Sequence, residues 1–134
     1  MSKCRFVSRS AAVLLWAVTS IGCDGGIFVR GVIQTEDLRP VADAEFALRH
    51  SNTSRSWEGK SNGNGCFDAG GVVATGRRMY QLTLSEPGYK AVSTSLHTSH
   101  WYYCTVTLVL ESSIAESEVT CIDDEVDESL PCHR

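Results

Sequence analysis

The sequence has few of the features that mark the commonest functional classes. Its 12 basic side chains are outnumbered by 16 acidic ones, so it lacks the basic face that a nucleic-acid-binding protein needs. It has no repeats, no phosphate-cradling glycine loop and no C-x-x-C pair. Its 134 residues make about one domain, which excludes a large two-domain enzyme. With 43% hydrophobic and 21% charged residues, most of the chain is expected to fold.

Residues 1–22 are predicted to be a cleaved secretory signal peptide. A basic start precedes an apolar run at residues 11–18, which is shorter than the roughly 20 residues that span a bilayer. The run leads to Ser20-Ile21-Gly22-Cys23, which resembles the lipobox of bacterial lipoproteins. That resemblance implies cleavage before Cys23 and a diacylglycerol group on its sulfur. The alternatives are an ordinary signal peptide cut nearby and an uncleaved anchor.

The mature chain is expected to be an acidic lipoprotein of the bacterial cell envelope. Removal of residues 1–22 leaves nine basic and sixteen acidic side chains and a formal charge of −7. No polybasic patch reinforces the anchor, so the acyl chains on Cys23 must hold the protein at the membrane. Asp24 resembles the inner-membrane retention signal of enterobacterial lipoproteins, which favours the inner membrane. The protein would then face the periplasm, an oxidising compartment in which disulfides persist.

After a tether at residues 23–27, residues 28–111 are predicted to form one all-β domain. Apolar and polar residues alternate at 44–48, 80–84 and 104–110, which is the period of two of half-buried strands. Proline, glycine and asparagine mark the turns between these segments. No window of twelve residues in this part shows a sustained helical period. Short strands with a turn at roughly every 8–12 residues predict a β-sandwich.

A series of short motifs supports a more specific prediction. In chain order they are Val29-x-Gly31-x-Ile33, Pro40-Val41-x-x-Ala44-x-Phe46, Gly65-x-Phe67, Tyr80-x-Leu82 and Pro87-Gly88-Tyr89. Together they resemble the carboxypeptidase regulatory-like domain, a seven-stranded Greek-key sandwich of the transthyretin (prealbumin) type. Leu38 and Asp43 stand where that family usually has glycine. The resemblance implies a non-catalytic structural or protein-interaction module without a cofactor.

Three of these motif residues have a physical role that can be predicted. Gly31 should let two backbones approach closely, because glycine has no Cβ. Phe67 and Tyr80 should fill the core between the sheets.

Residues 112–134 are predicted to be an acidic tail. From Glu111 to Arg134 the chain has eight acids and one base, and most such runs are solvated and partly disordered. Two of the cysteines, Cys121 and Cys132, lie in this tail.

Four cysteines are predicted to form disulfides, because Cys4 leaves with the signal peptide and Cys23 takes the lipid. The preferred pairs are Cys66–Cys104 within the sandwich and Cys121–Cys132 within the tail. One observation opposes the first pair: Cys66 has the opposite strand parity to the core-pointing Phe67, whereas Cys104 points inward. In the alternative, both tail cysteines bind the tail to the sandwich.

Exposed aromatic residues supply a second candidate function. Trp57, Trp101 and Tyr102 belong to a set of rings larger than one small core needs. Rings near polar loops can stack on sugars or anchor a protein, so carbohydrate binding is an alternative function. Packing of these rings against the acidic tail is the competing expectation.

Catalysis and metal binding are not expected. His97, His100, Tyr102 and Tyr103 resemble in type the ligands of intradiol dioxygenases, but those come from separated strands of longer chains. A polar loop entering an aromatic strand is the preferred interpretation. Cys132 and His133 lack the paired spacing of a zinc site, and residues 62–65 lack the carboxylates of a calcium loop. A transthyretin-like hydrolase is a remote alternative, since the Tyr-Arg-Gly-Ser motif of hydroxyisourate hydrolases is missing.

Overall fold

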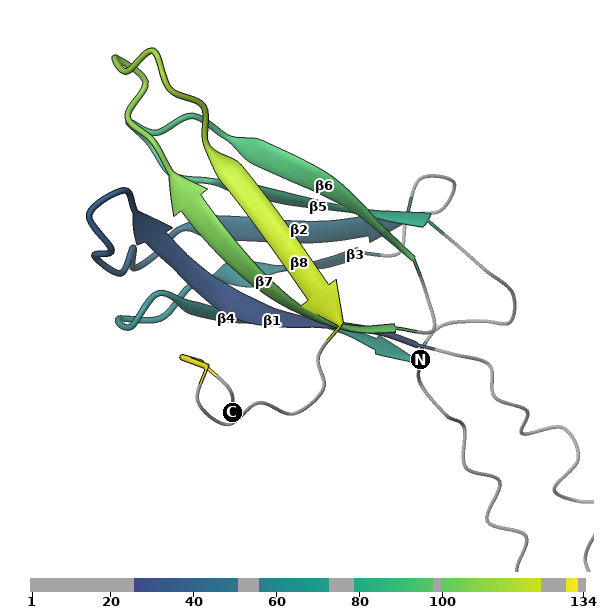
Figure 1. Cartoon of the computed structure of the whole chain (residues 1–134). Helices are drawn as coiled ribbons and strands as arrows, with labels where there is room; N and C mark the ends of the chain where they lie inside the picture. The colour runs from purple at the N-terminus through teal and green to yellow at the C-terminus, as the bar shows by residue number, and fades with distance from the viewer. Residues whose placement is uncertain (1–25, 51–55, 73–78, 98–99, 124–129, 133–134) are drawn as a thin grey trace, which may run out of the picture.

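The chain forms an all-β sandwich of two four-stranded sheets (Figure 1). The computed structural model describes residues 26–50, 56–72, 79–97, 100–123 and 130–132. The strands are β1 (Gly26–Thr35), β2 (Glu45–His50), β3 (Ser56–Lys60), β4 (Cys66–Val72), β5 (Met79–Ser85), β6 (Val92–His97), β7 (His100–Leu108) and β8 (Glu118–Asp123). In the described part of the chain, no helix is long and apolar enough to cross a membrane.

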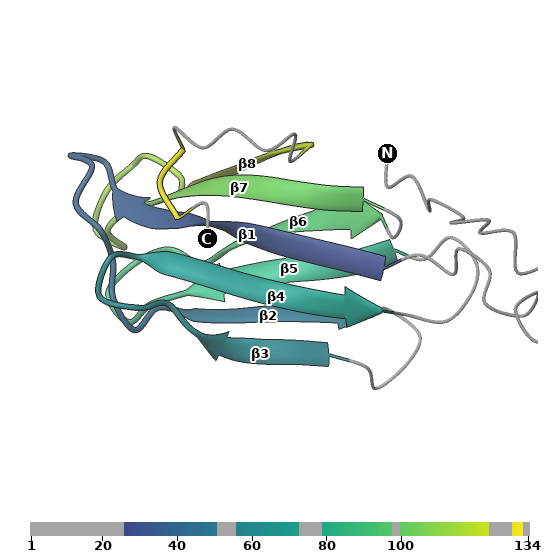
Figure 2. The same ribbon diagram turned by 90° about the horizontal axis from the view of Figure 1, so that it is seen from below.

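The strand order agrees with the predicted transthyretin-like type. The first sheet has the order β4-β1-β7-β8 and the second β3-β2-β5-β6. The chain crosses between the sheets after β1, β3, β4 and β6, and β2–β3, β5–β6 and β7–β8 are antiparallel neighbours within one sheet. Figure 2 shows the strands from below. The structure therefore confirms the all-β sandwich, but its described residues form eight strands where the resemblance implied seven.

The eighth strand lies in the segment that its composition marked as a solvated tail. β8 pairs with β7 in antiparallel register, with Val106 opposite Val119 and Cys104 opposite Cys121. Val119 and Cys121 pack against the core, while the residues between them are exposed. This is the alternation of a half-buried strand, so the first sheet extends to Asp123, beyond the predicted domain end at residue 111.

The apolar residues of the predicted alternating segments form the core between the two sheets. Phe46, Leu48, Leu82 and Val106 all point between the sheets and are at most 8% exposed. Phe67 and Tyr80 are also buried, as predicted, at 4% and 3% exposure. The remaining core members are Ile27, Val29, Ile33, Val41, Ala44, Ala69, Leu84, Leu96, Cys104 and Leu108.

β1 is the central strand of the first sheet and pairs on both sides. It runs antiparallel to β4 and parallel to β7. Gly31 lies opposite Phe67 on one neighbour and Cys104 on the other. The β1 and β7 backbones approach closely at Gly31, as its lack of a Cβ predicted.

Two turn residues between β1 and β2 have an unusual backbone. Leu38 and Asp43 have φ angles of 64° and 60°, in the left-handed region that glycine adopts most easily. These are the two positions where the resembled family usually has glycine. Both turns therefore have the left-handed backbone that glycine favours, although this chain has leucine and aspartate at these positions.

Candidate functional site

Two disulfides hold the C-terminal part of the chain to the sandwich. Cys104 on β7 bonds to Cys121 on β8, with the two Cα atoms 4.0 Å apart, and the bond lies on the core side of the first sheet. Cys66 on β4 bonds to Cys132, with Cα atoms 5.3 Å apart and a sequence separation of 66. The preferred pairs, Cys66–Cys104 and Cys121–Cys132, are therefore wrong, and the alternative in which both tail cysteines bind the sandwich is right. The reason is the side of the sheet to which each side chain points. Cys66 points away from the core and Cys104 into it, so the two cannot bond to each other.

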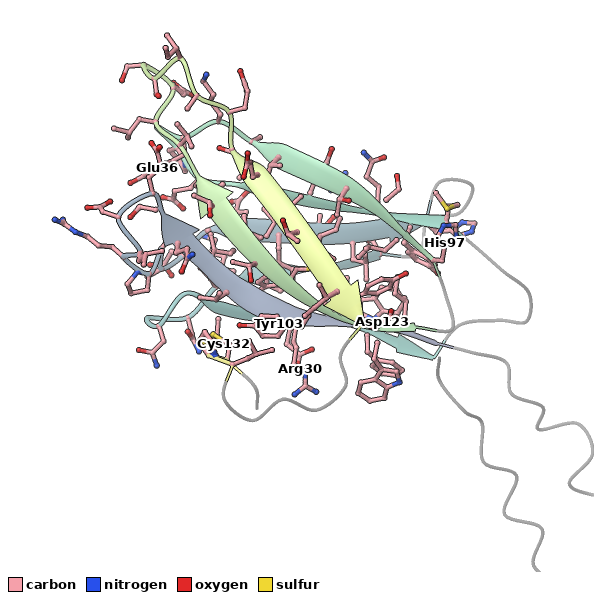
Figure 3. All side chains as sticks on the ribbon, in the orientation of Figure 1. Arg30, Glu36, His97, Tyr103, Asp123 and Cys132 are labelled. Atoms are coloured by element: carbon pink, nitrogen blue, oxygen red, sulfur yellow. A yellow bond between two sulfur atoms is a disulfide. The ribbon has the colours of Figure 1, made fainter. Side chains whose placement is uncertain are left out.

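The second disulfide fixes a segment over the outer face of the first sheet. We call residues 130–132 the C-terminal strap. It lies beside β1 and β4 in both views (Figures 1 and 2). The Tyr103 hydroxyl, on this outer face, donates a hydrogen bond to the carbonyl oxygen of Pro131. Figure 3 shows Tyr103, Arg30 and Cys132 on the same side of the sheet.

The strap accounts for apolar burial on a face that would otherwise be open to solvent. Tyr103 is 2% exposed and Val32 7% exposed, although neither belongs to the core between the sheets. Val32 lies opposite Cys66 in the β1–β4 register, next to the disulfide, and Tyr103 lies beneath Pro131. The middle of this outer face is therefore covered by the chain itself.

The three predicted ligand-contact aromatics do not share one surface. Trp57 is half-buried and packs against Tyr80, with ring centroids 5.7 Å apart. Tyr102 also packs against the core, and its hydroxyl oxygen accepts a hydrogen bond from the backbone N–H of His97 at 3.1 Å. Trp101 alone of the three is classed as exposed, at 41%, and it lies on the outer face of the first sheet.

Trp101 has a partner that the sequence did not reveal. Phe28 on β1 lies opposite it in the parallel β1–β7 register, and the two rings stack with centroids 4.3 Å apart. Ile122 on β8, 52% exposed, lies diagonally across from Trp101 on the same face. We call Phe28, Trp101 and Ile122 the aromatic end. It lies beyond the strap, at the end of the sheet where β1 begins.

The His/Tyr group does not form one site among the described side chains. Tyr102 and Tyr103 are adjacent on β7, so their side chains point to opposite faces of the sheet. His97 is exposed at the end of β6, in the other sheet, and the side chain of His100 lies outside the described part.

Other metal candidates are also accounted for. In the described ranges, no group of three or more His, Cys, Asp and Glu residues could hold a metal ion. Cys132 is bonded to Cys66, and His133 lies outside those ranges. Residues 62–65 form a turn in which the Asn62 side-chain oxygen accepts hydrogen bonds from the N–H groups of Asn64 and Cys66.

The outer face of the second sheet carries a hollow lined by paired charges. Arg49 and Glu58 form an ion pair across β2 and β3, with 2.6 Å between nitrogen and oxygen. Glu45 and Lys60 lie opposite each other in the same register. Opposite charges thus alternate across this face, and no charge of one sign accumulates to bind an ion.

Acidic residues gather at the end of the sandwich opposite the aromatic end. The described loops there, residues 36–44, 86–91 and 109–117, carry six acids and two bases. One of the acids, Asp37, has a lowered pKa, chiefly because the Thr35 hydroxyl donates to its carboxylate at 2.8 Å. A hydrogen bond from its own backbone and the nearby Arg39 guanidinium act in the same direction.

The predicted lipid site, Cys23, and Asp24 lie outside the described residues. In the sequence, Asp24 and Gly25 alone separate Cys23 from Gly26, the first residue of β1. Neither disulfide uses Cys23.

Comparison with known proteins identifies a fold and no family. No protein-family model matches the chain, and no curated protein matches it. The wild-type catechol 1,2-dioxygenase of Acinetobacter radioresistens superposes with a TM-score of 0.54 and 10% identity, over 77% of this chain and 58% of that one. Two single-residue variants of that enzyme give a TM-score of 0.53 and 12% identity over the same shares.

The likeness to dioxygenases is limited to the sandwich. This chain spans about half the length of the dioxygenases that it matches, from 44% to 55% for three of them. At such identity the superposition shows the shared fold alone.

Proposed function

We propose that the protein is a lipid-anchored lipoprotein of the bacterial cell envelope. Its sandwich would be a non-catalytic structural or protein-interaction module of the carboxypeptidase regulatory-like kind. The observation that carries this proposal is the disulfide pairing. All four cysteines of the sandwich and tail pair with one another, and the pairing leaves Cys23 for acylation. Disulfides of this kind persist in exported proteins and are rare in the cytosol.

The position of Cys23 supports the anchor. It follows an apolar run with a basic start, the arrangement of an export signal. It also precedes β1 by only three positions, so an acyl group there would hold the sandwich directly at the membrane surface.

Two features support the module. The left-handed turns at Leu38 and Asp43 coincide with the family's glycine positions. Among the described residues, Tyr102 and Tyr103 point to opposite faces of the first sheet, and His97 meets the Tyr102 hydroxyl through its backbone N–H, so these three side chains do not converge as a ligand set would.

Metabolic labelling with an alkyne fatty acid tests the anchor. We expect the wild-type protein to be labelled and the Cys23→Ala variant to lose the label. Cys4→Ala is the matched control, because Cys4 would be removed with the signal peptide, and it should label like the wild type. Equal labelling of Cys23→Ala and wild type would refute the anchor.

Elemental analysis tests the non-catalytic module separately. Protein purified with both disulfides intact should carry no stoichiometric metal. One metal ion per chain would contradict the module and favour a metalloenzyme on the same sandwich.

A further inference from the structure

We propose that the aromatic end of the sandwich (Phe28, Trp101 and Ile122) rests in the headgroup layer of the membrane, so that the outer face of the first sheet leans toward the lipid. This inference rests on the proposed anchor at Cys23. It adds a second point of contact and a fixed orientation, neither of which acylation alone supplies.

The first argument is the length of the tether between Cys23 and Gly26. Three residue steps join Cys23 to Gly26, and at about 3.5 Å per extended residue they reach roughly 10 Å. Phe28 lies two residues into β1, about 7 Å from Gly26 along the strand. Because the reach of the tether exceeds this distance, the sandwich can lean until Phe28 meets the headgroups. The opposite end of β1, at Thr35, is too far along the strand to do so.

The chemistry of the aromatic end carries the second step. Trp101 and Ile122 are 41% and 52% exposed, and Phe28 is stacked on the Trp101 ring. Tryptophan is enriched at membrane–water interfaces, where its ring contacts acyl chains and its N–H meets polar headgroups. The strap covers Val32 and Tyr103 on the same face, but it leaves these three side chains uncovered or only partly covered.

The charge distribution carries the third step. Exposed apolar residues also occur at the opposite end, for example Leu110 and Ile114, but they lie among the loops with six acids and two bases. Anionic lipid repels such a surface. In the described part of the aromatic end the acid beside these side chains is Asp123, which alternates to the opposite side of β8 from Ile122, so the three apolar side chains face away from it. This is also the end from which the tether leaves.

Depth-dependent fluorescence quenching tests the orientation. Residues 23–134 contain every described strand, the whole core and both disulfides, so this chain can be exported behind a cleavable non-lipoprotein signal. Coupling Cys23 to a maleimide lipid then anchors it on vesicles of phosphatidylcholine and phosphatidylglycerol whose acyl chains carry bromine near the headgroup. Trp101 emission is the difference between the wild-type chain and Trp101→Phe, which leaves Trp57 as background.

We expect bromine to quench Trp101 at least about twofold more strongly than a tryptophan at the acidic end, since only the former would lie in the interface. The matched control is Ile114→Trp combined with Trp101→Phe, because Ile114 is fully exposed. Equal quenching at the two ends would overturn the inference. So would Trp101 shielding that rises with protein concentration and needs no vesicles, because a second copy of the chain would then cover the aromatic end.

The two proposals fail separately in this design. Chemical coupling anchors Cys23 whether or not cells acylate it. Quenching of Trp101 therefore tests only the orientation of the sandwich on the membrane. A wild-type protein that takes no fatty-acid label in cells, or one labelled no more than Cys23→Ala, would refute the natural anchor, whereas absent quenching with Cys23-dependent labelling would refute only the orientation.

Discussion

A Cβ atom on Gly31 of β1 would lie 1.9 Å from the carbonyl oxygen of Cys104 on β7. That oxygen belongs to backbone in the middle of the first sheet, so it cannot rotate away as a flexible side chain could. The parallel pairing of the first and seventh strands, and with it the position of the Cys104–Cys121 disulfide, depends on the missing side chain at this position.

Gly31→Ala should therefore destabilise the sandwich strongly. Forcing apart two packed strands costs at least about 2 kcal/mol, and the midpoint of urea unfolding should fall accordingly. Gly63→Ala is the matched control, because a Cβ at Gly63 meets nothing within 4 Å and its φ is not in the left-handed region. It should change the free energy of unfolding by less than about 0.5 kcal/mol. Equal effects of the two substitutions would contradict the close approach.

Glycine at Leu38 should stabilise the protein. A leucine in the left-handed region costs about 1–2 kcal/mol, which glycine relieves at the expense of some unfolded-state entropy. We expect Leu38→Gly to raise the free energy of unfolding by about 1 kcal/mol in a urea titration. Asp43→Gly should gain less, because aspartate tolerates this conformation better. Ile114→Gly, at an exposed position without positive φ, should give no gain.

The strap should protect Tyr103 from solvent. In the double variant Cys66→Ser/Cys132→Ser, Pro131 is no longer held over the ring, and Tyr103 should become open to nitration, read by peptide mass spectrometry. Tyr102 is the internal control, because it packs against the core from the other face of β7. Continued protection of Tyr103 in the double variant would show that the strap stays in place without its disulfide.

Thr35→Val should raise the pKa of Asp37 toward its ordinary value of 3.8, because the Thr35 hydroxyl is the main cause of the lowered pKa. A lowered folded-state pKa contributes stability above the unfolded pKa, and that contribution disappears as the pH falls through the folded value. The substitution should thus remove a small stabilisation at neutral pH. It should also make the free energy of unfolding fall less as the pH is lowered into the acid range. Titration by NMR measures the pKa, and Arg39→Gln should shift it less.

Local patterns were sufficient for most of the fold. The alternation around Phe46, Leu82 and Val106 identified strands and their inward faces, because burial between two sheets imposes a period of two. The eighth strand was missed because the acids around Val119 and Cys121 dominate the composition, although these two residues alternate like any half-buried strand.

Contacts between distant residues could not be predicted in the same way. The stacking of Phe28 on Trp101 depends on the register of β1 against β7, which are separated by five strands in the sequence. The disulfide partners depend on the same long-range geometry. Parity did show that Cys66 and Cys104 face opposite ways, and that observation was the better guide to the pairing.

The central place of β1 has a mechanical consequence. A force applied at Gly26 would act along a strand bonded on one side to β4 and on the other to β7. Such a load shears two ladders of hydrogen bonds at once instead of peeling them one by one from an edge. If the protein is anchored at Cys23 as proposed, its sandwich is therefore expected to withstand tension from the attachment point.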